Sequence, residues 1–191
     1  INSEGDESFP PMASLTLGAE NGDPRAPALL INELMYHPVT AELDFIEVWN
    51  RSGAPLPLFD VENPENTWRL SGVDFDFPPG QTLASDELAL IVRTDPESFR
   101  TAYGLSPGVK IYGPYPGSLD NGGERLTIRR PDGPSPDGNG GTIVPMIEVD
   151  TVRYDDAAPW PSEADGQGPS LERINFDAFS DDPANWTASA E

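Results

Sequence analysis

The sequence predicts an all-β fold, a sandwich or barrel, on three observations. Apolar segments of strand length, rich in β-branched and aromatic residues, recur along the chain. Turn formers such as Pro78-Pro79-Gly80 and Asp132-Gly133 separate these segments. The 191 residues also include 22 prolines and 18 glycines, which suit turns and weaken long helices. Together these features favour several short strands joined by tight turns.

The first 27 residues differ from the rest of the chain. They are rich in proline, glycine and acidic residues and hold few large apolar side chains. This composition predicts a linker or an irregular N-terminal arm, in which residues 12–17 can pair as one strand. The folded domain is expected to span residues 28–191.

The strand predictions follow the apolar segments from residue 28 onward. In the second segment, alternation places Ile46 and Val48 on one face and Phe45, Glu47 and Trp49 on the other. The predicted strands span residues 28–36, 44–50, 67–71, 73–77, 87–92, 109–112, 125–130, 145–154 and 170–175.

One short helix is expected to cross between strands, at residues 96–103. Asp95 is a good N-cap, and a proline follows it at the first helical position. Phe99 and Tyr103 are four residues apart and share one face, and Gly104 supplies a C-terminal stop.

Two further structural expectations concern the four tryptophans and a glycine-containing turn. Trp49, Trp68, Trp160 and Trp186 are expected to supply much of the bulk of a leucine-poor core. Asn121-Gly122 is expected to supply the positive φ angles of a tight hairpin.

The charge of the chain excludes several classes of partner. The sequence has 33 acidic and 11 basic residues, for a formal charge of −22, and Lys110 is its one lysine. Nucleic-acid binding draws on clustered Lys and Arg, so we expect no nucleic-acid partner, and cationic partners or bound cations are favoured. No segment reaches the roughly 18–20 apolar residues of a membrane span, so no membrane insertion is expected. The lack of cysteine excludes a disulfide scaffold, a zinc–thiolate site and a cysteine nucleophile.

Several motifs occur in an order that resembles the lamin-tail domain. A strand ending in Asn50-Arg51-Ser52 is followed by Trp68-Arg69-Leu70, and then by Phe77-Pro78-Pro79-Gly80, which leads to Thr82-Leu83. The later segment, residues 118–128, is similar to the family's final hairpin, in which a Gly-rich turn feeds a strand. The resemblance implies an immunoglobulin-like β-sandwich, and the helix signal at residues 96–103 adds one short crossing helix to it.

The likeness is strongest to the bacterial, exported branch of that family. It rests on residues 31–38, on Trp160-Pro161, on residues 164–172 and on Asn185-Trp186, and it extends over roughly residues 29–187. The resemblance implies a non-catalytic module of a larger multidomain chain, acting in attachment or assembly through a protein or a surface polymer. It also implies an extracellular or cell-surface location in a bacterium, or a periplasmic one.

The alternative is a carbohydrate-active or other hydrolase that uses Glu33 and Glu47. These acids lie on the first two predicted strands and could approach each other as a glycosidase pair does. The favoured interpretation is structural, with both acids satisfied by arginines such as Arg69 or Arg173 or by backbone donors. His37 is the only histidine, and no nucleophile near it in the sequence suggests a catalytic triad. We therefore expect no catalytic residue.

Calcium is the one candidate ion, although no cofactor is required. Asp155, Asp156 and Asp165 flank Trp160-Pro161 in acidic turns, and calcium sites are built from Asp oxygens and backbone carbonyls in turns. Residues 137–141 resemble part of a calcium loop but lack its bidentate Glu, so a flexible tip is expected there.

Overall fold

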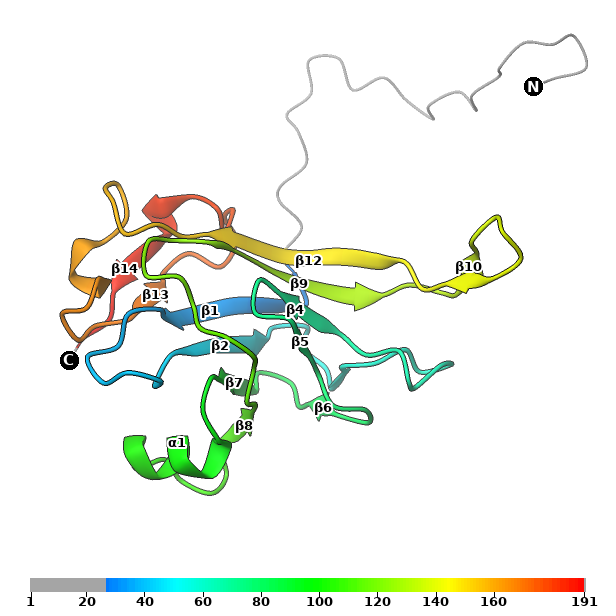
Figure 1. The fold of residues 1–191 in the computed structure, drawn as a ribbon, viewed down its shortest axis with the longest axis horizontal. Coiled ribbons are helices and arrows are strands. Elements are labelled where there is room, and N and C mark those ends of the chain that lie inside the picture. The colour runs from blue at the N-terminus through cyan, green and yellow to red at the C-terminus, as the bar shows by residue number, and fades with distance from the viewer. Residues whose placement is uncertain (1–26, 191) are drawn as a thin grey trace, which may run out of the picture.

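The computed structural model describes residues 27–190, which form an all-β sandwich with one short helix (Figure 1). The all-β prediction is therefore confirmed. The expected N-terminal arm, with its strand at residues 12–17, lies outside the described residues. No helix in the described part of the chain is long and apolar enough to cross a membrane.

The larger layer is a six-stranded sheet. Its neighbours pair antiparallel, except that β7 and β8 run parallel. The strands, in spatial order, are β14 (Trp186–Ala188), β13 (Leu171–Arg173), β1 (Leu29–Met35), β2 (Phe45–Asn50), β7 (Leu88–Val92) and β8 (Lys110–Tyr112).

The second layer is a four-stranded antiparallel sheet, and two small two-stranded sheets accompany it. The four strands are, in order, β12 (Met146–Arg153), β9 (Arg125–Pro131), β4 (Arg69–Ser71) and β5 (Phe75–Asp76). The small sheets pair β3 (Leu56–Pro57) with β6 (Thr82–Leu83), and β10 (Ser135–Pro136) with β11 (Thr142–Ile143).

Each predicted strand corresponds to an observed one, with shifts at the ends. The strands that were not predicted are β3, β6, β10, β11 and β14, which have two or three residues each. Segments this short show no measurable alternation. Two short 3₁₀ turns, Ser162–Ala164 and Pro183–Asn185, complete the chain's C-terminal third.

The main core lies between the two large sheets. Ile46 and Val48 are fully buried there, as predicted for that face of β2. The tryptophan prediction holds for three residues and is wrong for Trp49, which lies half-buried on the other face with its ring 5.0 Å from that of Phe176. The three core tryptophans are Trp68, Trp160 and Trp186.

The helix α1 (Pro96–Tyr103) forms where it was predicted and crosses from β7 to β8. The Asp95 carboxylate accepts the backbone N–H of Ser98 at 2.9 Å, and Gly104 ends the helix with φ +62°. The helix covers the outer face of the six-stranded sheet, where Phe99 packs on Phe45 with ring centroids 5.9 Å apart. Because parallel strands need a crossover connection, the helix also explains the parallel β7–β8 pair.

The predicted hairpin turn is wrong in its detail. Neither Asn121 nor Gly122 has a positive φ, and the residue that adopts one is Gly123, with φ +104°. A Cβ atom at Gly123 would lie 2.5 Å from the carbonyl oxygen of Tyr154, so only glycine fits this close approach.

Candidate functional site

The two candidate catalytic acids lie directly opposite each other on adjacent strands. Glu33 of β1 pairs in register with Glu47 of β2 on one side and with Glu172 of β13 on the other. These three residues form a glutamate row across the middle of the six-stranded sheet, on the outer face that also carries α1. The sequence placed Glu33 and Glu47 near each other but gave no sign of Glu172.

Polar neighbours, rather than arginines, satisfy the half-buried pair. Glu33 accepts a hydrogen bond from the Ser170 hydroxyl at 2.5 Å, and Glu47 accepts one from the Asn32 amide at 2.7 Å. Burial raises the pKa of both carboxyls, and the negative charge of Glu172 raises each further. Like charges directly opposite each other on a sheet are unfavourable, so this row costs stability when it is ionised.

The expected arginine partners are wrong, because both arginines have other partners. Arg69 binds Asp76 on the four-stranded sheet, with nitrogen–oxygen distances of 2.5 and 2.9 Å. Arg173 donates to the Asp150 carboxylate at 3.0 Å, and both side chains are buried. Sequence periodicity could not indicate this second pair, because its members lie 23 positions apart on different sheets.

The three candidate calcium ligands lie in turns. Asp165 lies 2.6 Å from Nδ1 of His37, and Asp155 accepts the backbone N–H of Ala157 at 2.9 Å. Asp156 is exposed in the bend that follows β12. Burial, followed by the charges of Asp165, Asp156 and Asp155, raises the pKa of Tyr36 to about 12. Within residues 27–190, no three His, Asp or Glu side chains form a group that could hold a metal ion. Calcium binding at these turns thus stays a prediction. Backbone carbonyl groups would have to supply the further oxygen ligands.

Residues 137–141 form the turn between β10 and β11. The Asp137 carboxylate accepts the backbone N–H groups of Asn139 and Gly141, each at 2.8 Å. This carboxylate therefore serves the turn itself.

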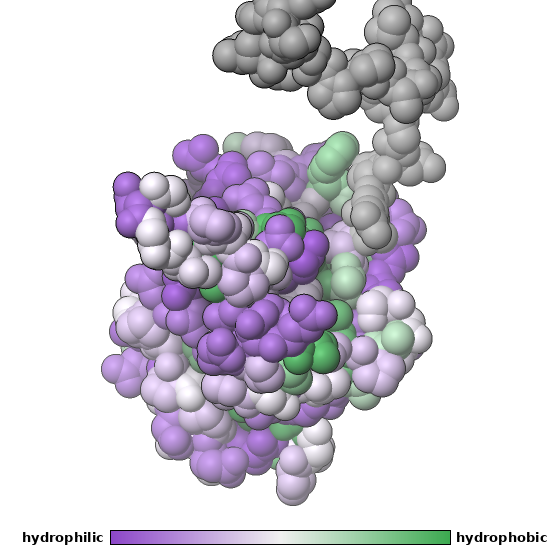
Figure 2. Space-filling model, turned by 90° about the vertical axis from the view of Figure 1, so that its right-hand side faces the viewer, coloured by the Kyte–Doolittle hydropathy of each residue, from purple (hydrophilic) through white to green (hydrophobic). Residues whose placement is uncertain are grey.

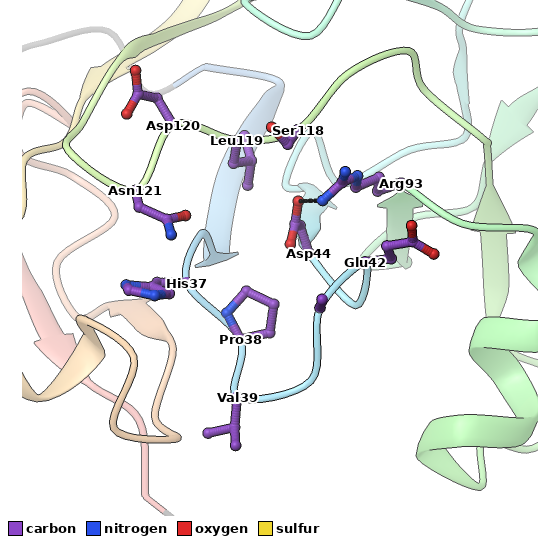
Figure 3. A pocket seen from close by; sticks show the side chains of 11 residues that line it. His37, Pro38, Val39, Glu42, Asp44, Arg93, Ser118, Leu119, Asp120 and Asn121 are labelled. Carbon is purple, nitrogen blue, oxygen red and sulfur yellow. Dashed lines mark hydrogen bonds and ion pairs between the residues drawn. The ribbon is translucent and has the colours of Figure 1, made fainter.

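An open pocket of about 660 Å³ lies at the end of the sandwich where β1 turns into β2 (Figure 3). The turn at residues 37–44, Arg93 and residues 118–121, which precede β9, line it. In Figure 3, Asp44, Glu42 and Arg93 lie on one side of the pocket, and His37 and Asn121 lie on the other. We call this the His37–Asp44 pocket.

The most buried charge of the pocket is Asp44, which is 4% exposed. Its carboxylate lies 3.4 Å from the guanidinium of Arg93. Burial raises the pKa of Asp44, and the Arg93 charge opposes that rise. The hydroxyl of buried Tyr115 has no partner, and burial followed by the Asp44 charge raises its pKa. Neither Asp44 nor Arg93 could be singled out from the sequence, because they lie 49 positions apart and belong to no motif.

The His37–Asp165 contact provides two members of a catalytic triad. A triad also needs a hydroxyl hydrogen-bonded to the other imidazole nitrogen. Among the described residues, the one hydrogen bond that His37 makes is the one to Asp165. Ser118 lines the same pocket but lies away from the imidazole in Figure 3. Among the described residues, the pocket therefore shows no hydroxyl that is hydrogen-bonded to His37.

No protein-family model matches the chain, and no curated protein and no solved structure matches it either.

Proposed function

We propose that this chain is a non-catalytic, immunoglobulin-like lamin-tail module of an exported bacterial protein, acting in attachment or assembly. Its partner would be a protein or a surface polymer, and its place a larger multidomain chain outside the cell, on the cell surface or in the periplasm. The motifs behind the resemblance support this proposal because they have structural roles. Buried Asn50, for example, donates to the carbonyl groups of Ala54, Leu83 and Ala84, which ties the end of β2 to the turn after it, to β6 and to the turn before β7.

The observation that carries the proposal is the setting of Glu33 and Glu47. A glycosidase holds its two acids on either side of a scissile bond, in a cleft that surrounds the substrate. Here the two acids lie side by side on a sheet face, and each accepts a hydrogen bond from a neighbouring side chain, Ser170 or Asn32. Neither acid lines the His37–Asp44 pocket.

One observation favours the alternative, a hydrolase. A carboxyl group with a raised pKa beside a second carboxyl is what a general acid requires. Burial raises the pKa of both Glu33 and Glu47. The two functions therefore differ in whether these carboxyls cleave a substrate: in a hydrolase they would, and in a binding module they would not.

The test uses the 191-residue chain and its Glu33→Gln and Glu47→Gln variants. Each is incubated with soluble polysaccharides and with unfolded protein substrates, and released reducing ends and peptides are measured. Binding of the same polymers is followed by co-sedimentation. We expect binding without bond cleavage, unchanged in both variants, because glutamine keeps the oxygen that accepts from Ser170 or Asn32. A hydrolytic activity that either variant loses while its melting temperature is retained would establish the hydrolase instead.

A further inference from the structure

We propose that residues 12–17 of this chain add to the four-stranded sheet as a further strand, paired with the outer edge of β12. Their apolar side chains lie in the groove beside that edge. This pairing is independent of the attachment function, because it assigns a partner from within the chain to a surface that the described residues leave open.

β12 is an edge strand whose first half is open. It pairs with β9 alone and, at eight residues, is the longest strand in the described part of the chain. Apart from that pairing, residues 146–149 make no backbone hydrogen bond to another described segment. An exposed strand edge presents unpaired N–H and C=O groups, which a further strand satisfies. The open half of β12 is therefore a place where a strand fits.

The second half of the same edge is covered. The Asp181 carboxylate accepts the backbone N–H of Arg153 at 2.6 Å, and the Ser180 hydroxyl donates to the carboxylate of Asp150. The fold thus protects β12 from Asp150 onward and leaves residues 146–149 for another partner.

An open groove of about 810 Å³ adjoins this open half, and we call it the β12 groove. Its apolar wall includes Ile147 and Val149 of β12, Leu56 of β3 and Trp68. Leu56 and Val149 are half-buried and pack on the main core. The core is therefore not closed here. Covering these side chains removes apolar surface from water, which stabilises the fold.

The side of the molecule on which β12 begins is mainly hydrophilic (Figure 2). Its hydrophobic areas are small and separated. The apolar wall of the groove is therefore a local feature, which suits a short segment and gives a large protein partner little apolar surface to bury.

Pro27, the first described residue, lies at this groove. It lines the β12 groove and also a smaller pocket of about 210 Å³ that reaches Val149 and Phe179. The nine residues 18–26 join it to residue 17 and span up to about 30 Å when extended. Residues 146–149 span roughly 13 Å as a strand. The connection is therefore long enough for residues 12–17 to turn back along β12.

The sequence of residues 12–17 suits an added edge strand. Its length is typical of strands, and Pro11 before it and Gly18 after it mark its ends. Alternation gives the segment an apolar face and a mainly polar face. The apolar face consists of Ala13, Leu15 and Leu17, and the other consists of Met12, Ser14 and Thr16. One face thus meets the groove, and the other meets solvent.

A second copy of the chain is the competing occupant. With a formal charge of −22, two copies repel each other. Residues 12–17 carry no charge, and their short connection gives them an effective concentration in the millimolar range at the groove. The chain's own segment is thus the occupant that the observations favour.

The experiment uses the whole 191-residue chain and measures amide hydrogen exchange by NMR, together with the melting temperature. We expect those amides of residues 146–149 that face away from β9 to be protected in the original chain. The Leu15→Asp, Leu17→Asp double variant places two charges on the apolar face. In this variant the same amides should exchange roughly tenfold faster or more, and the melting temperature should fall by roughly 2–4 °C or more, because the groove loses its apolar cover.

The matched control is the Ser14→Asp, Thr16→Asp double variant. It adds the same charge to the same segment, on the face that meets solvent. The protection of residues 146–149 and the melting temperature should equal those of the original chain. The amides of β2 should stay protected in all three proteins, which shows that the fold is intact.

Three results would overturn the proposal. The first is rapid exchange at the outer edge of β12 in the original chain, which would leave that edge free for a strand from a partner. The second is equal loss of protection in the two double variants, which would assign the effect to charge. The third is protection that increases with protein concentration, which would assign the edge to a second copy of the chain.

Discussion

At the scale of single residues, Glu33 and Glu47 carry charge where their surroundings oppose it. The two are in register on neighbouring strands, and Glu172 continues the row. Burial and this like charge raise the pKa of Glu33 and Glu47 above their usual value of 4.5. Protons therefore bind more tightly to the folded chain than to the unfolded one.

The upward direction of these pKa shifts predicts how the stability of the fold depends on pH. The stability due to these two groups is fully present below pH 4.5 and is lost as the pH rises through their folded-state pKa. We expect Glu47→Gln to raise the free energy of unfolding at pH 7 by about 0.2–1 kcal/mol, the range for cross-strand pairs. The gain should vanish near pH 4, where the original carboxyl is protonated. Urea unfolding at both pH values measures it.

Glu62→Gln is the control for this prediction, because Glu62 is exposed and lies in a loop. Its substitution should leave the difference between the two pH values unchanged. A Glu47→Gln variant that is less stable than the original at pH 7 would show that the Asn32 contact outweighs the repulsion.

At the scale of elements, the two large sheets are tied by one buried ion pair. Asp150 of β12 accepts from Arg173 of β13 at 3.0 Å and from the backbone N–H of Ile31, in β1, at 2.8 Å. The hydroxyl of Ser180 also donates to this carboxylate. One carboxylate thus joins three strands and the segment after β13.

Arg173→Met should destabilise the fold strongly. The substitution leaves the Asp150 charge buried without its cation, and breaking a buried pair in this way costs about 3–5 kcal/mol. Arg69→Met is the matched control, because the Arg69–Asp76 pair has side chains 50% and 53% exposed. Exposed pairs contribute at most about 1 kcal/mol. Thermal unfolding of the two variants compares them, and equal, small shifts would contradict the structural role of Arg173.

At the scale of the whole molecule, a charge of −22 makes the acids repel one another. A divalent ion at the turns of Asp155, Asp156 and Asp165 would relieve part of that repulsion and stabilise the fold by mass action. We expect the melting temperature to be higher in millimolar calcium than in chelator at matched ionic strength. The rise should disappear in Asp155→Asn or Asp165→Asn. A melting temperature equal in the two solutions would remove the site.

Signals that are local in the chain were sufficient to predict much of this fold. The alternation of Ile46 and Val48 predicted the buried face of β2, and the Asp95 cap, with Gly104 after it, predicted both ends of α1. These signals succeed because the alternation of a strand and the capping of a helix depend on residues a few positions apart.

Only the tertiary structure decided which residues meet. The register that sets Glu33 against Glu47 and Glu172, and the Asp44–Arg93 pair in its pocket, join residues far apart in the sequence. Trp49 was mispredicted for another reason: its size predicted a core position, although the alternation of β2 had already placed it on the face opposite Ile46 and Val48, where it packs on Phe176. The sequence by itself determined nine of the strands, the helix and the negative charge, but not the short strands β3, β6, β10, β11 and β14. The pairing of the strands determined the candidate site, because each contact there joins residues that are far apart in the sequence and that meet only when the strands pair.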